Sequence, residues 1–79
     1  MIFIFYGNKG QATDVDLEHL KALTTLQYLN LPFSKVTDAG LEHLKGLTNL
    51  EELDLRATNV TDEGVKKLQQ ALPNCTIVR

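Results

Sequence analysis

The sequence predicts an α/β repeat fold with a parallel sheet on its concave face and helices on its convex face. Three observations predict it. Residues 12–35 and 36–59 are identical at 12 of 24 aligned positions, and each copy carries an alternating strand pattern and a helical leucine spacing. A repeat of this length is one supersecondary unit that buries its apolar face by stacking on its neighbours. Because each 24-residue unit contains one strand and one helix that returns the chain, consecutive strands are expected to run parallel.

Within the second copy, residues 50–56 alternate apolar and polar, so Leu53 and Leu55 are expected to face the core. Leu41, Leu44 and Leu47 recur every three residues, which predicts a helix of about two to three turns. Thr37-Asp38 precedes that helix as Thr61-Asp62 precedes the next, and one residue of each pair is expected to be the N-cap.

We divide the chain as one domain of residues 1–79. Residues 1–11 are the leading strand and turn of an incomplete repeat, 12–35 and 36–59 are full repeats, and 60–79 is a C-terminal capping repeat. The capping repeat fits the pattern only with one inserted residue. We expect its helix to end before Pro73 and a short strand to follow around Cys75 to Val78.

The leading strand takes its predicted register from the same 24-residue spacing. Subtracting 24 from the strand positions of the first full repeat places Ile2 and Phe5 in leucine positions. It also places Ile4 in line with Tyr28 and Glu52, in a column of side chains that runs across the sheet and points outward. The other outward columns are Tyr6, Asn30 and Asp54, and Asn8, Pro32 and Arg56. An uncovered apolar edge made by Ile2, Phe3, Ile4 and Phe5 would be a template for pairing with another chain, or a sign of further repeats in front of it. Both interpretations stay open.

The pattern Leu-x-x-Leu-x-Leu at Leu26, Leu29 and Leu31, repeated at Leu50, Leu53 and Leu55, resembles the leucine-rich repeat family. The Thr-Asp-x-Gly-Leu continuation at 37–41 resembles its ribonuclease-inhibitor-like branch, with the bacterial and F-box-associated 24-residue repeats. This resemblance implies a short horseshoe-shaped solenoid that recognises a protein on its concave face. Many such repeats carry Asn or Cys where this chain has Ser34 and Thr58, so a turn ladder would have to use hydroxyl groups.

The resemblance and the outward columns together suggest a non-catalytic protein-interaction module. Aromatic anchors beside a polar rim are typical of binding hot spots. The residues expected to contact a protein partner are Tyr6, Tyr28, Asn30, Glu52, Asp54 and Arg56. Ordinary solvated sheet residues would give the same pattern. Two alternatives are a self-assembling unit that forms a homo-oligomer through the leading strand, and the C-terminal fragment of a longer receptor or ubiquitin-ligase adaptor.

Other chemistries are not indicated. His19 and His43 have no fixed third ligand for a metal, and Asp14, Asp38 and Asp62 are better explained as helix caps than as a cation site. Ser34, Cys75 and the histidines are expected on different faces, and Gly7 to Gly10 lacks the Gly-Lys-Ser/Thr ending of a phosphate loop. We therefore expect no enzyme activity, no cofactor and no metal.

Charge and the chain start bear on partners and location. The net charge of −2 lacks the basic stripe that binds nucleic acid. The apolar start, residues 1–6, is too short for a signal peptide or a membrane span. The single cysteine, Cys75, suits a reducing compartment and is expected to pack in the core. These features predict a soluble cytoplasmic protein that binds neither nucleic acid nor membrane.

Overall fold

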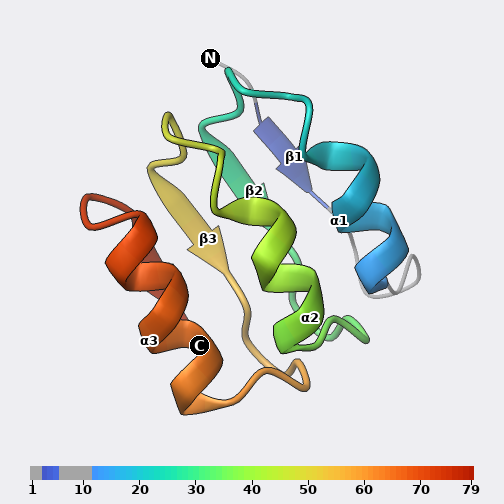
Figure 1. Ribbon diagram of the computed structural model, residues 1–79. Helices are drawn as coiled ribbons and strands as arrows, with labels where there is room; N and C mark the ends of the chain where they lie inside the picture. The colour runs from blue at the N-terminus through green and yellow to red at the C-terminus, as the bar shows by residue number, and fades with distance from the viewer. Residues whose placement is uncertain (1–2, 6–11) are drawn as a thin grey trace.

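A computed structural model of the protein describes residues 3–5 and 12–79. Strands and short helices alternate along the chain (Figure 1). The elements are β1 (Phe3–Phe5), α1 (Asp14–Leu20), β2 (Tyr28–Asn30), α2 (Asp38–Leu41), the 3-10 helix η1 (Glu42–Leu44), β3 (Glu52–Asp54), α3 (Asp62–Ala71) and β4 (Thr76–Val78). The helix expected to end before Pro73 and the strand expected after it are confirmed as α3 and β4.

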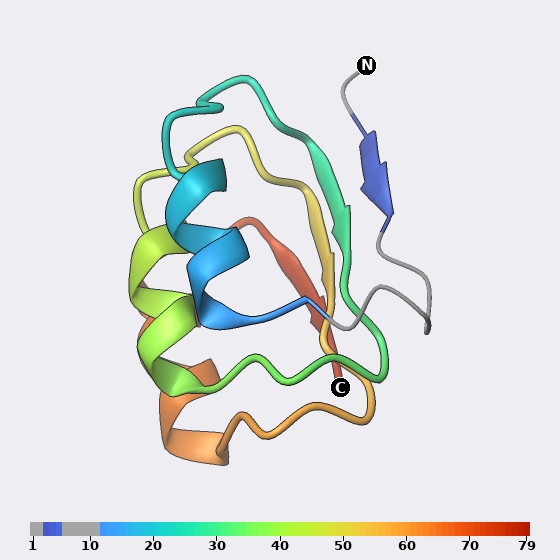
Figure 2. The same ribbon diagram turned by 90° about the vertical axis from the view of Figure 1, so that its right-hand side faces the viewer.

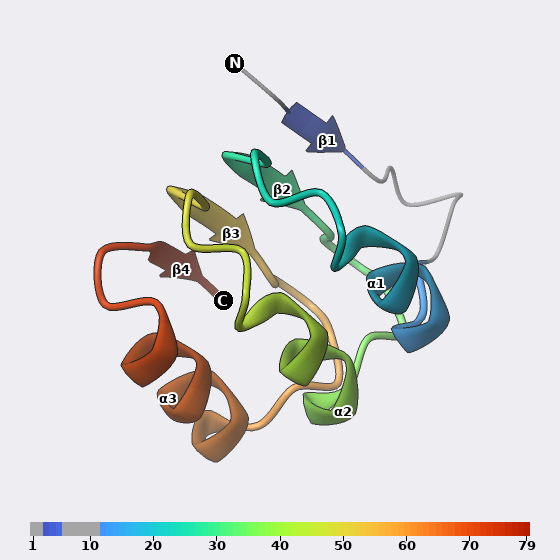
Figure 3. The ribbon, with the colours of Figure 1, turned by 45° about the horizontal axis from the view of Figure 1, so that its top comes forward.

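The elements form two layers. In the described residues the strands make one parallel sheet in the order β1-β2-β3-β4. The helices α1, α2 and α3 lie side by side on one face of this sheet (Figures 2 and 3). The parallel α/β arrangement expected from the repeat is therefore confirmed.

The core lies between the two layers and is built mainly from leucine. Each unit contributes side chains at matching positions, as Leu29 and Leu53 do from adjacent strands in register. The largest fully buried side chains are Leu17, Leu26, Leu29, Leu31, Val36, Leu41, Leu44, Leu47, Leu53, Leu55 and Leu68. Full burial of one leucine contributes about 1.5–3 kcal/mol, so stacking of the units is the main source of stability.

The predicted register of the leading strand is wrong by one residue. Ile4 pairs with Leu29, and Phe3 pairs with Tyr28. Ile4 therefore takes the leucine position and packs against the core rather than standing beside Tyr28 on the outer face. A slip of one residue exchanges the two faces of a strand, and the connection before α1 is one residue longer than the 24-residue spacing assumes.

The third unit also differs from the sequence prediction, which placed one inserted residue in its repeat. The strand spacing of 24 residues is kept, because Leu53 pairs with Ile77. The irregularity lies before the strand, where α3 runs for 10 residues while α1 has 7. Leu72 and Cys75 then complete the core of this unit.

Adjacent helices are joined by a repeated contact that we call the Asp–Thr ladder. The backbone N–H of Thr37 donates to Asp14 Oδ1 at 2.8 Å, and its hydroxyl donates to Asp14 Oδ2 at 2.6 Å. Thr61 donates to Asp38 in the same way, at 2.8 and 2.5 Å. The N-caps are the threonines. The interpretation of the aspartates as caps is therefore wrong: Asp14 and Asp38 each bind the cap of the next helix, and Asp62 pairs with Arg79.

Two glycines make room for this ladder. A Cβ atom placed on Gly40 would lie 2.3 Å from Asp14 Oδ1, and one on Gly64 would lie 2.1 Å from Asp38 Oδ1. Both distances are far below van der Waals contact. The Thr-Asp-x-Gly sequence is therefore needed by packing between units, and not only by the helix that it starts.

The expected ladder of turn hydroxyls is not formed. The hydroxyl of Thr58 donates to the carbonyl of Leu55 in its own unit, at 2.7 Å. Ser34 is 5 % exposed, and its Oγ has no hydrogen-bond partner in the described residues. The polar link between units is supplied at the helix starts instead.

Gly64→Ala should destabilise the protein, because the new methyl group displaces the Asp38 carboxylate from Thr61. Loss of hydrogen bonds to a charged group costs about 1.5–3 kcal/mol each, so we expect at least about 2 kcal/mol in urea unfolding. Gly46→Ala is the matched control, because a Cβ there meets no atom within 4 Å. Equal effects of the two substitutions would contradict the packing role of Gly64.

Acid should weaken the ladder. The Thr61 hydroxyl and N–H lower the pKa of Asp38 below its ordinary value of 3.8. A lowered pKa in the folded state stabilises the protein above the unfolded value, and this stabilisation is lost as pH falls through the folded-state pKa. We therefore expect the free energy of unfolding in urea, measured at a series of pH values below 5, to fall less steeply with pH in Asp38→Asn than in the parent. Glu63→Gln, which removes a surface carboxylate paired with Lys67, should leave the slope nearly unchanged.

Candidate functional site

The sheet surface opposite the helices carries two rows of side chains. We call it the sheet face and define it by Tyr28, Asn30, Glu52, Asp54, Arg56, Thr76 and Val78. Tyr28, Glu52 and Thr76 share one register position, while Asn30, Asp54 and Val78 share the next. The structure therefore brings Tyr28, Asn30, Glu52 and Asp54 together as predicted, and Arg56 lies two residues after Asp54.

Asp54 and Arg56 form a fixed ion pair on this face. Arg56 Nε and Nη2 donate to the two carboxylate oxygens at 3.0 and 2.8 Å, and the Arg56 backbone N–H donates to Oδ1 at 3.0 Å. Asp54 is only 7 % exposed, whereas the Arg56 side chain is 62 % exposed. A partner would therefore meet mainly the guanidinium, which Asp54 holds in one orientation.

The pair also fixes the charge states. The hydrogen bonds from the Arg56 side chain lower the pKa of Asp54, although burial opposes this shift. Asp54 in turn raises the pKa of Arg56. Both groups stay ionised at neutral pH, so the site offers an oriented cation with little net charge.

Phe33, which the sequence reasoning missed, extends this site. Its backbone N–H donates to the carbonyl of Arg56 at 2.9 Å, and its side chain is 62 % exposed. Its φ of 60° is left-handed, as is the φ of 57° at Ala57, so the turns after β2 and β3 share this conformation. A left-handed bulky residue costs about 1–2 kcal/mol, and an exposed ring recovers little of that cost.

A sequence signal for Phe33 was present. The repeat alignment sets it against Ala57 in a turn between strand and helix. A large aromatic residue in a turn where the sister unit has alanine has no packing explanation. The backbone conformation is common to both turns, so the feature specific to Phe33 is its exposed aromatic side chain.

Asn30 adds an unmatched polar atom to the same face. Its Oδ1 is buried and has no hydrogen-bond partner in the described residues. An unsatisfied acceptor of this kind costs free energy unless a donor arrives. The sheet face therefore has an oriented cation and an acceptor without a donor among the described residues, and the exposed Phe33 lies in the turn that follows β2.

The remaining predicted residues lie at or beyond the first strand. Tyr6 and Ile2 lie outside the described residues. Phe3, Ile4 and Phe5 form β1, which is the end strand of the sheet order. Because Ile4 packs against the core, its side chain is less available to a partner than its edge position suggested.

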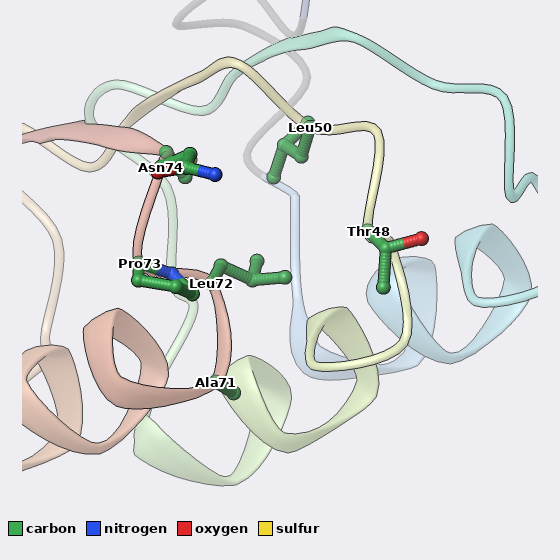
Figure 4. Close-up of a pocket in the computed structure, with 7 residues that line it drawn as sticks. Thr48, Leu50, Ala71, Leu72, Pro73 and Asn74 are labelled. Carbon is green, nitrogen blue, oxygen red and sulfur yellow. The ribbon is translucent and has the colours of Figure 1, made fainter.

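A small pocket of about 230 Å³ lies where the third unit departs from the repeat. Leu50 and Thr48 line it from one side, and Leu72, Pro73 and Asn74 from the other (Figure 4). Cys75 also lines it but is only 4 % exposed, and burial, assisted by the Glu52 charge, raises the pKa of its thiol to about 11. The core role expected for Cys75 is confirmed, and this thiol is a poor nucleophile.

No three His, Cys, Asp or Glu side chains in the described residues are grouped so that they could hold a metal ion. None of the helices in residues 12–79 is long and apolar enough to cross a membrane.

The fold and site define a class: a protein of stacked strand–helix units with an exposed parallel sheet. The family described as Leucine Rich repeat matches residues 22–45 and 46–68, which together exceed half of the chain. The chain therefore belongs to the leucine-rich repeat family. Repeats of this family generally mediate protein–protein interaction. A comparison with curated proteins finds no match.

The Cys75 thiol should react slowly with a disulfide reagent in the folded protein. A pKa near 11 instead of 9.0 lowers the thiolate fraction at pH 8 by roughly 100-fold, and burial slows access further. Absorbance at constant pH with and without denaturant measures the two rates. Similar rates in the two conditions would show that Cys75 is accessible in the native fold.

Proposed function

We propose that this chain is a non-catalytic protein-interaction module, and that it binds a protein partner on the sheet face, as the concave face of a short solenoid. The observation that carries the proposal is that Phe33 is exposed and that its backbone N–H binds the carbonyl of Arg56, whose guanidinium is also exposed. Phenylalanine and arginine are residue types that supply much of the binding energy at protein interfaces. Here one is exposed despite backbone strain, and the other is oriented by a buried carboxylate.

The rest of the face supplies specificity. Among residues 3–5 and 12–79 no donor reaches Asn30 Oδ1. Glu52 is exposed beside the Tyr28 register position, and Asp54 keeps Arg56 in place. Burying the guanidinium with its carboxylate already attached avoids leaving an unpaired charge in the interface. A partner with an apolar side chain for Phe33 and a hydrogen-bond donor for Asn30 suits this arrangement.

Self-association through the β1 edge is a second candidate. It is supported by the place of β1 at the end of the sheet order, where a further strand from another copy could pair. Sedimentation velocity over a range of concentrations tests it. A monomer at high micromolar concentration would count against it.

The Phe33→Gly variant separates function from stability. Glycine relieves the left-handed strain but increases the entropy of the unfolded chain, so the free energy of unfolding should stay unchanged or rise by up to about 1 kcal/mol. Capture of a partner from lysate, quantified against the parent chain, should fall roughly tenfold or more.

Arg56→Ala should reduce capture similarly, while Lys66→Ala on the exposed surface of α3 is the matched control. If Phe33→Gly and Arg56→Ala both capture the partner as well as the parent does, the sheet face is not the binding surface. If the control loses capture as well, binding instead involves the helix layer.

A further inference from the structure

The first unit departs from the Asp–Thr ladder at one position. Gly40 and Gly64 lie three residues after the capping threonines of α2 and α3. The corresponding residue after Thr13 is Asp16. Since a Cβ on either glycine would lie within 2.3 Å of the ladder carboxylate, a side chain at this position leaves no space for an aspartate from a neighbouring helix.

Asp16 also occupies the donor that such an aspartate would use. The backbone N–H of Thr13 donates to Asp16 Oδ2 at 2.8 Å. That distance equals the distances from the N–H of Thr37 to Asp14 and from the N–H of Thr61 to Asp38. The carboxylate that the other units receive from a neighbour is thus supplied in the first unit from within the same helix.

We propose that Asp16 is a stop residue that ends the Asp–Thr ladder at α1. A further helix placed beside α1 cannot make the contact that joins α1 to α2, for three reasons. The Cβ of Asp16 occupies the space, its carboxylate occupies the donor, and two carboxylates at one site repel each other. The residue thereby acts against stacking of another unit, whether that unit belongs to this chain or to a second one.

Apolar side chains of the first unit are exposed and could pack against a further unit. Leu23 is 43 % exposed, although its counterpart Leu47 in the second unit is fully buried. Val15 in the first turn of α1 is exposed as well. Apolar burial is non-directional, so loss of the Asp–Thr contact removes the directional contact between a neighbouring helix and α1.

The opposite end of the ladder has its own substitute. Asp62, the third ladder aspartate, forms an ion pair with Arg79. Arg79 Nη2 also donates to the carbonyl of Val60 at 3.4 Å. A cation from the end of the described chain therefore binds the carboxylate at the position where the next threonine would bind.

The test adds a unit in front of the first one. A copy of residues 36–59 inserted before Ala12 brings a ladder aspartate to Thr13, and thermal unfolding is measured with and without Asp16→Gly. In the natural chain this substitution should lower the unfolding midpoint by roughly 5 °C, because a capping carboxylate is lost and a glycine is gained. In the extended chain it should raise the midpoint, because the ladder can now form.

Two controls make the reversal specific. Asp16→Ala frees the donor but keeps a Cβ, so it should lower the midpoint in both chains. Replacing the inserted copy's ladder aspartate with alanine should remove the gain from Asp16→Gly. If the extended chain with Asp16→Gly is no more stable than the extended chain with Asp16, including the case in which neither folds, the proposal is wrong.

Discussion

The contact between neighbouring units is the constraint on which the rest of this structure depends. No unit encloses its own leucines, so each buries them against the next one. The apolar core supplies most of the stabilisation but little direction, because leucine surfaces can slide past each other. The two-point binding of each capping threonine by an aspartate is directional and fixes where one helix lies against the next. Leucine burial thus supplies the affinity between units, and the carboxylate supplies the register.

The sheet face follows from that register. The strands are three residues long, but backbone hydrogen bonds between the units continue beyond them, as from the N–H of Leu31 to the carbonyl of Asp54. These bonds and the helix layer behind the sheet together align the strands. That alignment sets Asn30 beside Asp54 and brings the N–H of Phe33 to the carbonyl of Arg56. The residues proposed to bind a partner are therefore positioned by hydrogen bonds within the sheet together with the helix contacts behind it.

The sequence predicted what is periodic. Leucine spacing located the helices and the strand cores, and Pro73 located the end of α3. The sequence pattern could not predict the register of β1, because the length of the irregular connection between β1 and α1 decides which face of the sheet Ile4 occupies. The partners of Asp14 and Asp38 were also missed, since a capping residue and a residue that binds the next cap look alike in a linear pattern. Among the site residues, the pattern placed Tyr28, Asn30, Glu52 and Asp54 on one face. Burial of Asp54 and exposure of Phe33 depend on neighbours that only the folded chain brings near.

Because only some units carry the glycine that the Asp–Thr ladder needs, the units differ in whether an internal gene duplication of them would give a continuous array. A gene segment encoding residues 36–59 would carry its own glycine, and each tandem copy could accept the aspartate of the copy before it. A segment encoding residues 12–35 would carry Asp16 into the interior of the array and interrupt it. Lengthening of such a protein is thus expected to start from its middle, and the first unit is inherited as a single copy. The side chain at this one position, glycine in residues 36–59 and aspartate in residues 12–35, therefore decides whether a unit can be duplicated within the array or can stand only at its start.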